Sequence, residues 1–377
     1  MSHRKSLAEI NLKNLKHNFA LIQKISPLRN FICPMVKANA YGHGAVEISK
    51  VLLELGVTYL GVGLIEEAIQ LREQQIKSQI LVFGIFDEAS GDAINDYQMT
   101  PVLSNFAELQ ILKKKVRAHS RQKIHLKFNT GMNRLGFELT QVDELRNFLA
   151  SNKNFELEGI CTHFVQGEDI HRQEGQSMQQ LQKIFAVSEK FKQHPHYLHA
   201  LNSSALISST AHDILDERVS ALGARPGIAL YGDLPEVKTL DLRPVMKLKS
   251  EIILLHQVKA GESVSYGGEF KIKKDSLIGV VPFGYADGYF RSLSNLGEVL
   301  CHGHLVPVVG TVCMDYLMID LTAIGNLENI QLGDEVVLFG KQKNKQILAS
   351  DLAKKVGTIS YEVFTRVSER VPRIFIR

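Results

Sequence analysis

The sequence predicts an α/β chain with an N-terminal (β/α)₈ barrel of the TIM type over residues 1–238 and a mostly β C-terminal domain over residues 239–377. Up to about Leu222, short apolar runs alternate with amphipathic stretches, and eight such units in roughly 200 residues suit this barrel. From Pro244 onwards the apolar runs become short, β-rich and separated by glycine or proline. A doubly wound open sheet is the alternative for the first part, although Gly61-Val62-Gly63 lacks the third glycine of a dinucleotide fingerprint.

The predicted barrel alternates strands with helices in the order that parallel βα units require. The expected strands are Phe31–Val36, Tyr59–Val62, Ile80–Gly84, Thr100–Leu103, Lys123–Phe128, Leu157–Thr162, Tyr197–Leu201 and Val219–Leu222. The expected helices include Ala45–Leu55, Glu66–Gln74, Ala107–Val116 and Gln179–Phe191. All the strands should therefore end at one face of the barrel.

The predicted second domain is mostly antiparallel and follows a polar linker, Asp233–Thr239, that contains Pro235. Its expected strands are Val245–Gln257, Leu277–Val281, Val299–Cys301, Val306–Val309, Leu317–Ile319, Val336–Phe339 and Ile374–Ile376. One helix-like segment, Ser350–Val356, interrupts them.

The composition describes an ordinary globular chain of 377 residues, with 45% hydrophobic residues and a net charge of +4. Its one lysine cluster, Lys113–Lys115, is expected on a solvated helix face, so neither nucleic acid nor an acidic membrane surface is implied. The four cysteines show no CxxC pairing, and the N-terminus has no long apolar segment. Reduced thiols and a cytoplasmic location are therefore expected.

Polar residues follow the apolar runs at five of the predicted strand ends. Lys37 ends the first strand and Lys127 the fifth, and His163, Ser203 and Arg225 follow the sixth, seventh and eighth. Barrels of this type carry their chemistry at the carboxyl ends of the strands. Five polar clusters at one face predict a catalytic site, although each residue taken alone also fits packing, helix capping or a rim ion pair.

Lys37 is the most informative of these residues. A buried, unpaired ammonium is costly, so a lysine at an inward strand end makes sense if its amine is consumed as a Schiff base with an aldehyde cofactor. Gly42 and Gly44 would let the backbone approach a bulky ligand, with Tyr41 beside it. A lysine that simply reaches solvent is the alternative for this position.

Two later segments are suited to binding a phosphate. Ser203 and the pair Gly227-Ile228 follow the last two predicted strands, where barrels of this type hold phosphate through backbone N–H groups and a hydroxyl.

The segment Val36–Gly44 resembles in full the lysine attachment segment of alanine racemases, fold-type III enzymes that use pyridoxal 5′-phosphate (PLP). The resemblance spans Ala8 to Arg377. In the second domain it rests on Val264–Gly268, Pro282–Gly288 and Gly310–Asp315. It implies interconversion of L- and D-alanine, with D-alanine supplied for cell-wall peptidoglycan. It also implies a head-to-tail homodimer with shared active sites.

The same resemblance implies a role for each site residue. Lys37 and Tyr266 would be two bases on opposite faces of the substrate, as racemisation requires. The cofactor would contact Lys37, Tyr41, His163, Ser203, Arg225, Gly227, Ile228 and Tyr361, and the substrate would contact Arg134, Tyr285, Met314 and Asp315. Lys127 would be a carbamylated lysine that orients Arg134.

Arg225 would face the pyridine nitrogen. A guanidinium cannot accept a proton, so the ring would stay unprotonated. Barrel-type decarboxylases favour a carboxylate at this place, so Arg225 argues against them.

Several alternatives remain open in the sequence. Asn129 stands where the family usually has aspartate, and the loop Val165–Asp169 also departs from the family pattern, so a broad-specificity amino-acid racemase is the nearest competitor. A non-catalytic PLP-binding carrier is a competitor of another class, and the second domain argues against it. The clusters Cys301–His304 and His194–His199 lack zinc-site spacing, so no metal is predicted.

Overall fold

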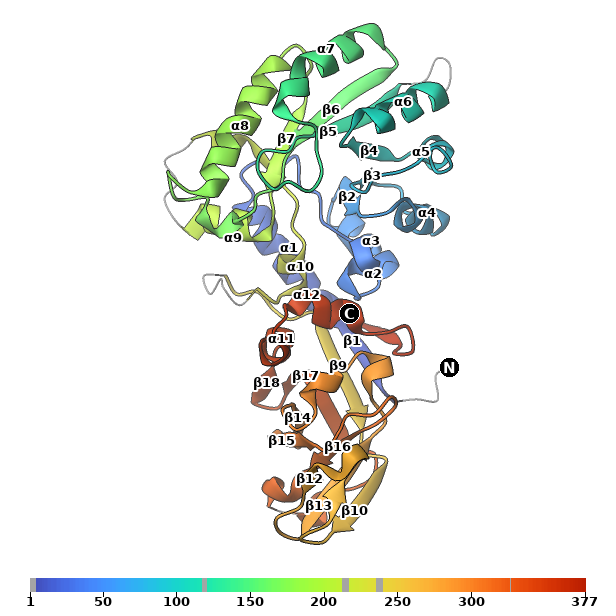
Figure 1. Cartoon of the computed structure of the whole chain (residues 1–377), viewed down its shortest axis with the longest axis vertical. Helices are drawn as coiled ribbons and strands as arrows, with labels where there is room; N and C mark the ends of the chain where they lie inside the picture. Colours follow the sequence, from blue (N-terminus) through green and yellow to red (C-terminus); the bar gives the residue numbers. More distant parts are fainter. Residues whose placement is uncertain (1–4, 117–120, 212–216, 235–239, 326) are drawn as a thin grey trace.

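The computed structural model describes residues 5–116, 121–211, 217–234, 240–325 and 327–377. Figure 1 shows two regions, with a helix-covered parallel sheet above a mostly β region. The strands of the upper sheet follow chain order from β2 to β8, all parallel. This arrangement confirms the predicted α/β barrel followed by a β-rich region.

The barrel strands run close to their predicted positions. They are β2 (Tyr59–Val62), β3 (Gln79–Val82), β4 (Thr100–Leu103), β5 (Gln122–Lys127), β6 (Phe155–Cys161), β7 (Tyr197–Leu201) and β8 (Leu222–Ala224). The eighth predicted strand was wrong in its bounds, because Glu217–Ala221 forms a 3₁₀ helix and the strand begins only where Leu222 pairs with Leu198 of β7.

The first predicted strand, Phe31–Val36, closes the ring without forming a regular strand. Ile32 forms an isolated parallel bridge to Ala224 of β8, and Met35 forms one to Gly61 of β2. Pro34 lies between them and has no N–H to donate, but its carbonyl accepts the N–H of Gly61 at 2.9 Å. This segment therefore joins the two edges of the sheet and delivers Lys37 to the face where the strands end.

Helices cover the outside of this sheet (Figure 1). The helices of this region are α1 (Leu12–Ile25), α2 (Lys37–Tyr41), α3 (Ala45–Glu54), α4 (Ile65–Glu73), α5 (Gly91–Asp96), α6 (Phe106–Lys115), α7 (Val142–Ser151), α8 (Gln176–Lys190), α9 (Ser203–Ala211) and α10 (Ile228–Tyr231). Of these, α2 and α10 lie at the strand ends and contribute to the pocket described below. Short 3₁₀ turns occupy Leu139–Gln141, Gly167–Asp169, Glu217–Ala221, Tyr266–Gly268, Tyr285–Asp287, Arg291–Leu293, Leu321–Ile324 and Leu327–Asn329. Among the described residues, no helix is long and apolar enough to cross a membrane.

The second region is built around a large, mainly antiparallel sheet. Its strands are β1 (Leu7–Asn11), β9 (Met246–Glu251), β10 (Leu254–Val258), β13 (Ser276–Val281), β14 (Glu298–Cys301), β15 (His304–Val309), β16 (Leu317–Asp320), β17 (Glu335–Gln342), β18 (Lys345–Ile347) and β19 (Arg373–Ile376). β11 (Ser263–Val264) and β12 (Phe270–Lys271) form a separate pair, and α11 (Ala349–Val356) and α12 (Ser360–Arg366) complete the region.

Both ends of the chain join this second sheet. β1 lies between β9 and β19, antiparallel to the first and parallel to the second. The predicted single strand Val245–Gln257 was wrong, because the chain passes from β9 to β10 at Ile252 and Ile253. There the N–H of Ile252 donates to the carbonyl of Asp334, and the N–H of Ile253 donates to the carbonyl of Val280. The predicted domain boundary after residue 238 and most of the predicted linker lie outside the described residues.

The two regions meet at the turn that carries Lys37. Helices α2 and α12 are in contact, and the carbonyl of Gly42 accepts a hydrogen bond of 2.9 Å from Nε of Arg373. Gly42 has a φ of +80°, and a Cβ added there would overlap the carbonyl oxygen of Phe364 in α12. The close approach of the second region to this turn therefore requires glycine.

Replacing Gly42 with alanine should destabilise the protein more than the matched change Gly56→Ala. Gly56 has a similar φ of +85° but has nothing within 4 Å of an added Cβ. Both variants should lose about 1–2 kcal/mol from the left-handed backbone, and Gly42→Ala should lose about 1–3 kcal/mol more from overpacking. Thermal unfolding followed by circular dichroism measures both; equal losses would contradict the close contact at Gly42.

Candidate active site

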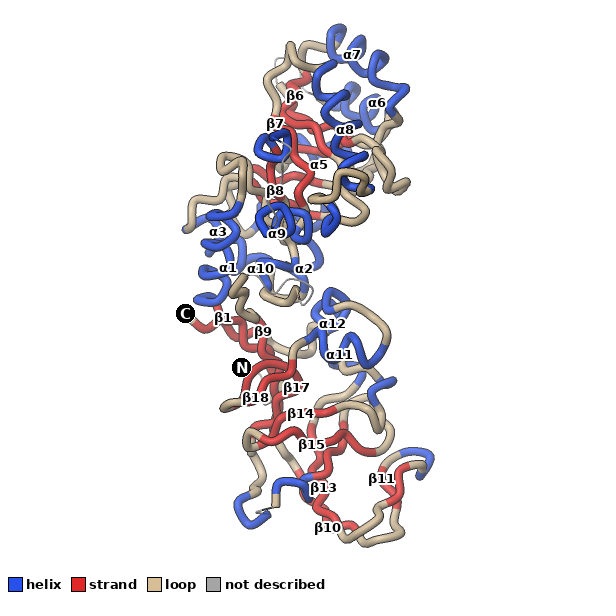
Figure 2. Tube along the Cα trace, turned by 90° about the vertical axis from the view of Figure 1, so that its left-hand side faces the viewer, coloured by secondary structure: helices blue, strands red, loops and turns tan. Residues whose placement is uncertain are grey.

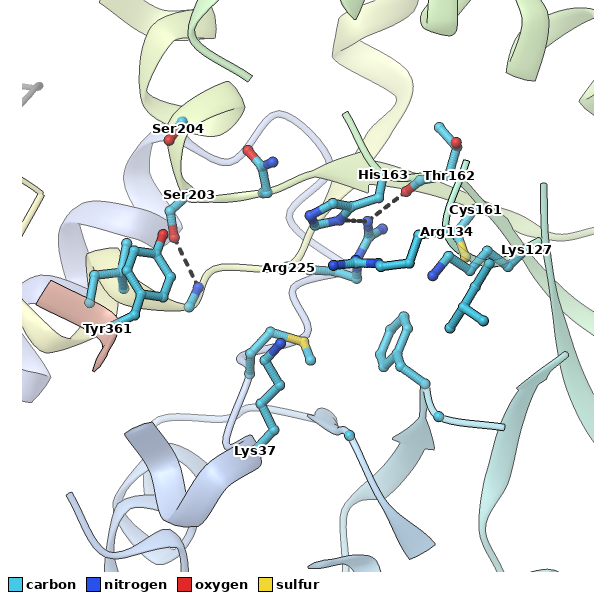
Figure 3. A pocket seen from close by; sticks show the side chains of 18 of the residues that line it. Lys37, Lys127, Arg134, Cys161, Thr162, His163, Ser203, Ser204, Arg225 and Tyr361 are labelled. Atoms are coloured by element: carbon cyan, nitrogen blue, oxygen red, sulfur yellow. Dashed lines mark hydrogen bonds between the residues drawn. The ribbon is translucent and has the colours of Figure 1, made fainter. Parts of the chain in front are cut away.

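A cavity of about 410 Å³ opens at the carboxyl ends of the barrel strands. Figure 3 shows its lining side chains converging from separate strands, with Lys37 directed into the space. Of the residues predicted from the sequence, it brings together Lys37, Tyr41, Lys127, Arg134, His163, Ser203, Arg225, Gly227, Ile228 and Tyr361. Tyr361 comes from α12, so both regions of the chain contribute to the pocket.

The backbone that presents Lys37 is left-handed. Residues 38–41 have φ between 51° and 54°, although none of them is glycine. This conformation costs roughly 1–2 kcal/mol per residue, and strain of this kind persists only where the surroundings hold it in place. The N–H of Ala40 donates to Val36, and the N–H of Ala38 donates to the carboxylate of Glu67 on α4. The turn is therefore a fixed feature that aims Lys37.

Both pocket lysines have amines with weakened basicity. Burial and the neighbouring Arg134 lower the pKa of Lys37, while Glu67 acts in the opposite direction. Burial also lowers the pKa of Lys127, and Arg225 and Arg134 add to this. A lowered pKa leaves more of each amine neutral, which is the form that attacks a carbonyl carbon.

The ionisable side chains that line the pocket are mainly basic. Its lining contains Lys37, Lys127, Arg134 and Arg225, and no aspartate or glutamate lines it in the described part of the chain. Like charges at close range repel, and a low local dielectric strengthens this repulsion. The pocket is therefore suited to a ligand with several negative charges.

One end of the pocket has a free hydroxyl donor and open space that suit a phosphate. Oγ of Ser203 accepts the N–H groups of Gly227 at 2.9 Å and Ala229 at 3.3 Å, so its own proton is free to donate to a ligand. A Cβ at Gly227 would overlap the hydroxyl of Tyr41, so glycine keeps this end open. The ring centroids of Tyr361 and Tyr41 lie 5.8 Å apart at this end.

Arg225 is buried and held by neutral acceptors. It donates to the carbonyl oxygens of His199 at 2.6 Å and Thr162 at 2.7 Å, and one of its nitrogens lies 3.4 Å from Nδ1 of His163 (Figure 3). Burial and the nearby Arg225 lower the pKa of His163 to about 3. His163 is therefore neutral at physiological pH and can accept a hydrogen bond from Arg225.

Four predicted site residues lie away from this pocket, on the second region. Tyr266 is 73% exposed, and Met314 is also exposed. The N–H of Tyr285 donates to the loop that carries Met314, and Asp315 accepts from Arg370 at 2.6 Å. Figure 2 shows β11, next to Tyr266, at the end of the molecule far from the barrel. Within one chain these residues do not complete the pocket.

The structure also reveals site residues that sequence reasoning missed. Glu67 supports the Lys37 turn, and His199 contacts Arg225 inside the barrel. Polar residues inside apolar strands, such as His199, were the available signal, but their pairing depends on the barrel register. No group of three metal-ligating side chains occurs among the described residues.

An α/β barrel that carries a strained lysine turn and a cation-lined pocket at its strand ends suits an enzyme that binds an anionic cofactor. Residues 10–235 match the family "Alanine racemase, N-terminal domain", and residues 245–375 match "Alanine racemase, C-terminal domain". The chain belongs to the alanine racemase family, whose members are PLP-dependent isomerases.

Individual alanine racemases are similar to this chain over nearly its full length. An alanine racemase of Thermodesulfovibrio yellowstonii is 41% identical, across 98% of this chain and 97% of that protein. The crystal structure of alanine racemase from E. faecalis superposes with a TM-score of 0.90 at 31% identity, covering 99% of both chains. Alanine racemase from Bacillus anthracis with bound L-Ala-P has a TM-score of 0.89 at 30% identity, covering 100% of this chain and 96% of that one.

The residues of the pocket fit PLP. The free hydroxyl proton of Ser203 and the open space at Gly227 suit the phosphate, and Lys37 has the weakened basicity that bonding to an aldehyde needs. The remaining cations suit the other negative oxygens of the cofactor and the substrate carboxylate.

Asn129 gives the loop before Arg134 a contact that aspartate could not make. Its Nδ2 donates to Asn133 and to the carboxylate of Glu138, both at 3.0 Å, while its Oδ1 accepts the N–H of Asn133 at 2.9 Å. Aspartate at this position would place two carboxylates in contact.

Asn129→Asp should therefore lower the melting temperature at neutral pH by about 1–3 °C. Adding Glu138→Gln should restore it, because only one carboxylate then remains. Thermal melts of the wild type, both single variants and the double variant measure this coupling. A melting temperature of Asn129→Asp equal to or above that of the wild type would rule out the contact with Glu138.

Proposed function

We propose that the chain interconverts L-alanine and D-alanine by a two-base reaction with PLP and thereby supplies D-alanine for cell-wall peptidoglycan. The observation that carries the proposal is the cation-lined pocket around Lys37, in a chain that matches alanine racemases along its whole length. When bound, PLP supplies an aldehyde that bonds to an amine and a ring that withdraws electrons from the substrate's α-carbon.

Lys37 holds the cofactor and moves the proton on one face of the substrate in this scheme. Its lowered pKa and its fixed turn support both tasks. Arg225 offers the ring nitrogen a hydrogen-bond donor that keeps its own proton, which moderates how strongly the ring withdraws electrons. Arg134, which also lines the pocket, is the proposed partner of the substrate.

Tyr266 is the proposed base for the opposite face. Its exposure and its position far from the pocket of its own chain support a head-to-tail homodimer, in which it reaches the pocket of the other subunit. Tyr285, Met314 and Asp315 would arrive with it, lining the entrance and binding the substrate. The exposed side chains of Tyr266 and Met314 would be covered in such a dimer.

Lys127 is proposed to carry a carbamate. An amine must be neutral to add to carbon dioxide, and the lowered pKa of Lys127 favours that form. The product would change one of the four pocket cations into an anion beside Arg134 and so relieve their mutual repulsion.

A cytoplasmic location is also proposed. All four cysteines are free, and three of them are buried, as expected for a chain kept under reducing conditions.

Borohydride treatment of the purified protein should fix a pyridoxyl group on Lys37, detected by peptide mass spectrometry. Chiral analysis should show exchange between L- and D-alanine. Lys37→Ala should lose both signals, whereas Lys113→Ala, which changes a lysine on the outer helix α6, should keep both. A pyridoxyl group on another lysine would overturn the role of Lys37. Equal exchange of several amino acids would replace alanine racemisation with broad-specificity racemisation.

A further inference from the structure

A row of buried polar side chains runs through the barrel behind the pocket. Arg225 Nη1 lies 2.7 Å from Nδ1 of His199. His199 Nε2 lies 2.8 Å from Nδ1 of His125 on β5, and His125 Nε2 lies 3.3 Å from Oε2 of Glu158 on β6. All four side chains are buried. We call these residues the Arg–His–His–Glu chain.

The direction of every hydrogen bond in this chain follows from Arg225. A guanidinium has only donors, so Nδ1 of His199 must accept, and a neutral His199 then carries its proton on Nε2. That proton must be donated to Nδ1 of His125, so His125 also carries its proton on Nε2. A second proton on either ring would set two N–H groups against each other.

The other end of the chain imposes the same direction. An ionised carboxylate only accepts, so Oε2 of Glu158 requires a proton on Nε2 of His125. Oε1 of Glu158 accepts from Nζ of Lys123 at 2.6 Å and from the hydroxyl of Tyr59 at 3.4 Å. Burial raises the pKa of Glu158, but the hydrogen bonds from His125 and Lys123 outweigh this and give a net lowering. The carboxylate therefore stays ionised.

The surrounding structure makes room for the two imidazoles. A Cβ at Gly159 would overlap the ring of His125, and one at Gly223 would crowd both Phe31 and His199. Phe31 stacks on His199 with ring centroids 4.6 Å apart. Burial, and the positive charge of Arg225, lower the pKa of both histidines. Both rings are therefore held in place and neutral.

We propose that Glu158 is a positioning residue for Arg225: its carboxylate fixes the Nε2–H tautomer of both neutral imidazoles and through them orients the guanidinium that faces the pocket. No carboxylate pairs directly with Arg225 among the described residues; the chain instead connects it to Glu158, whose carboxylate also pairs with Lys123. The consequence for cofactor binding rests on the proposed function, in which Arg225 meets the ring nitrogen. The tautomers of the two histidines do not depend on it.

The first test uses the unchanged full-length protein labelled with ¹⁵N-histidine. Two-bond ¹H–¹⁵N correlation spectra at neutral pH distinguish the two neutral tautomers and the charged ring. Signals of His125 and His199 are assigned by their loss in His125→Gln and His199→Gln. Both rings should be neutral with the proton on Nε2, with and without PLP. A proton on Nδ1 of either ring, or a charged ring, would overturn the proposal.

The second test compares Glu158→Gln with the matched control Glu156→Gln, which removes a less buried carboxylate two residues earlier on β6. Glu158→Gln should move the ¹⁵N signals of His125 and His199 and weaken PLP binding about tenfold, as expected for a lost hydrogen bond to a charged group. Glu156→Gln should leave both unchanged. Unaltered histidine signals and PLP affinity in Glu158→Gln would refute the positioning role. Failure of the wild type to bind PLP would refute the proposed function and leave the tautomer test standing.

Discussion

Four cations that face one small pocket are the constraint around which the rest of the structure is arranged. Lys37, Lys127, Arg134 and Arg225 line it, and no lining residue in the described ranges is acidic. Placing like charges together is unfavourable unless other groups offset them. The protein supplies part of the offset through Glu67, whose carboxylate accepts the N–H of Ala38 and acts to raise the pKa of Lys37. The remainder is left for anionic groups of the cofactor and substrate.

The residues suited to binding the cofactor and the residue suited to reacting with it are positioned in different ways. The residues with fixed hydrogen bonds, such as Arg225 and Ser203, lie on the barrel wall and leave their outward faces to a ligand. Lys37 instead projects from a strained left-handed turn that Glu67 and Val36 hold in place. Because α12 of the second region packs against this turn, the geometry of Lys37 depends on how the two regions meet.

Much of this architecture could be predicted from the sequence, because its signals are local. Apolar runs predicted the barrel strands, and polar residues after them predicted which side chains would reach the pocket. The irregular closure at Phe31–Val36 could not be predicted, because the apolar pattern does not show where Pro34 interrupts the pairing. The position of β1 in the second sheet could not be predicted either, because its partners β9 and β19 are hundreds of residues away in the chain. The link from Arg225 to Glu158 depends on the register of three strands, which spacing along the sequence does not contain.

Lys37 of one subunit is proposed to work with Tyr266 of the other. Lys37→Ala and Tyr266→Phe, each inactive alone, are unfolded together, refolded as a mixture and assayed for alanine racemisation. A mixed dimer with shared sites contains one intact site, so random pairing should restore about a quarter of wild-type activity. If each chain used its own Lys37 and Tyr266, no intact site could form. A mixture as inactive as its components would contradict an active site shared between subunits.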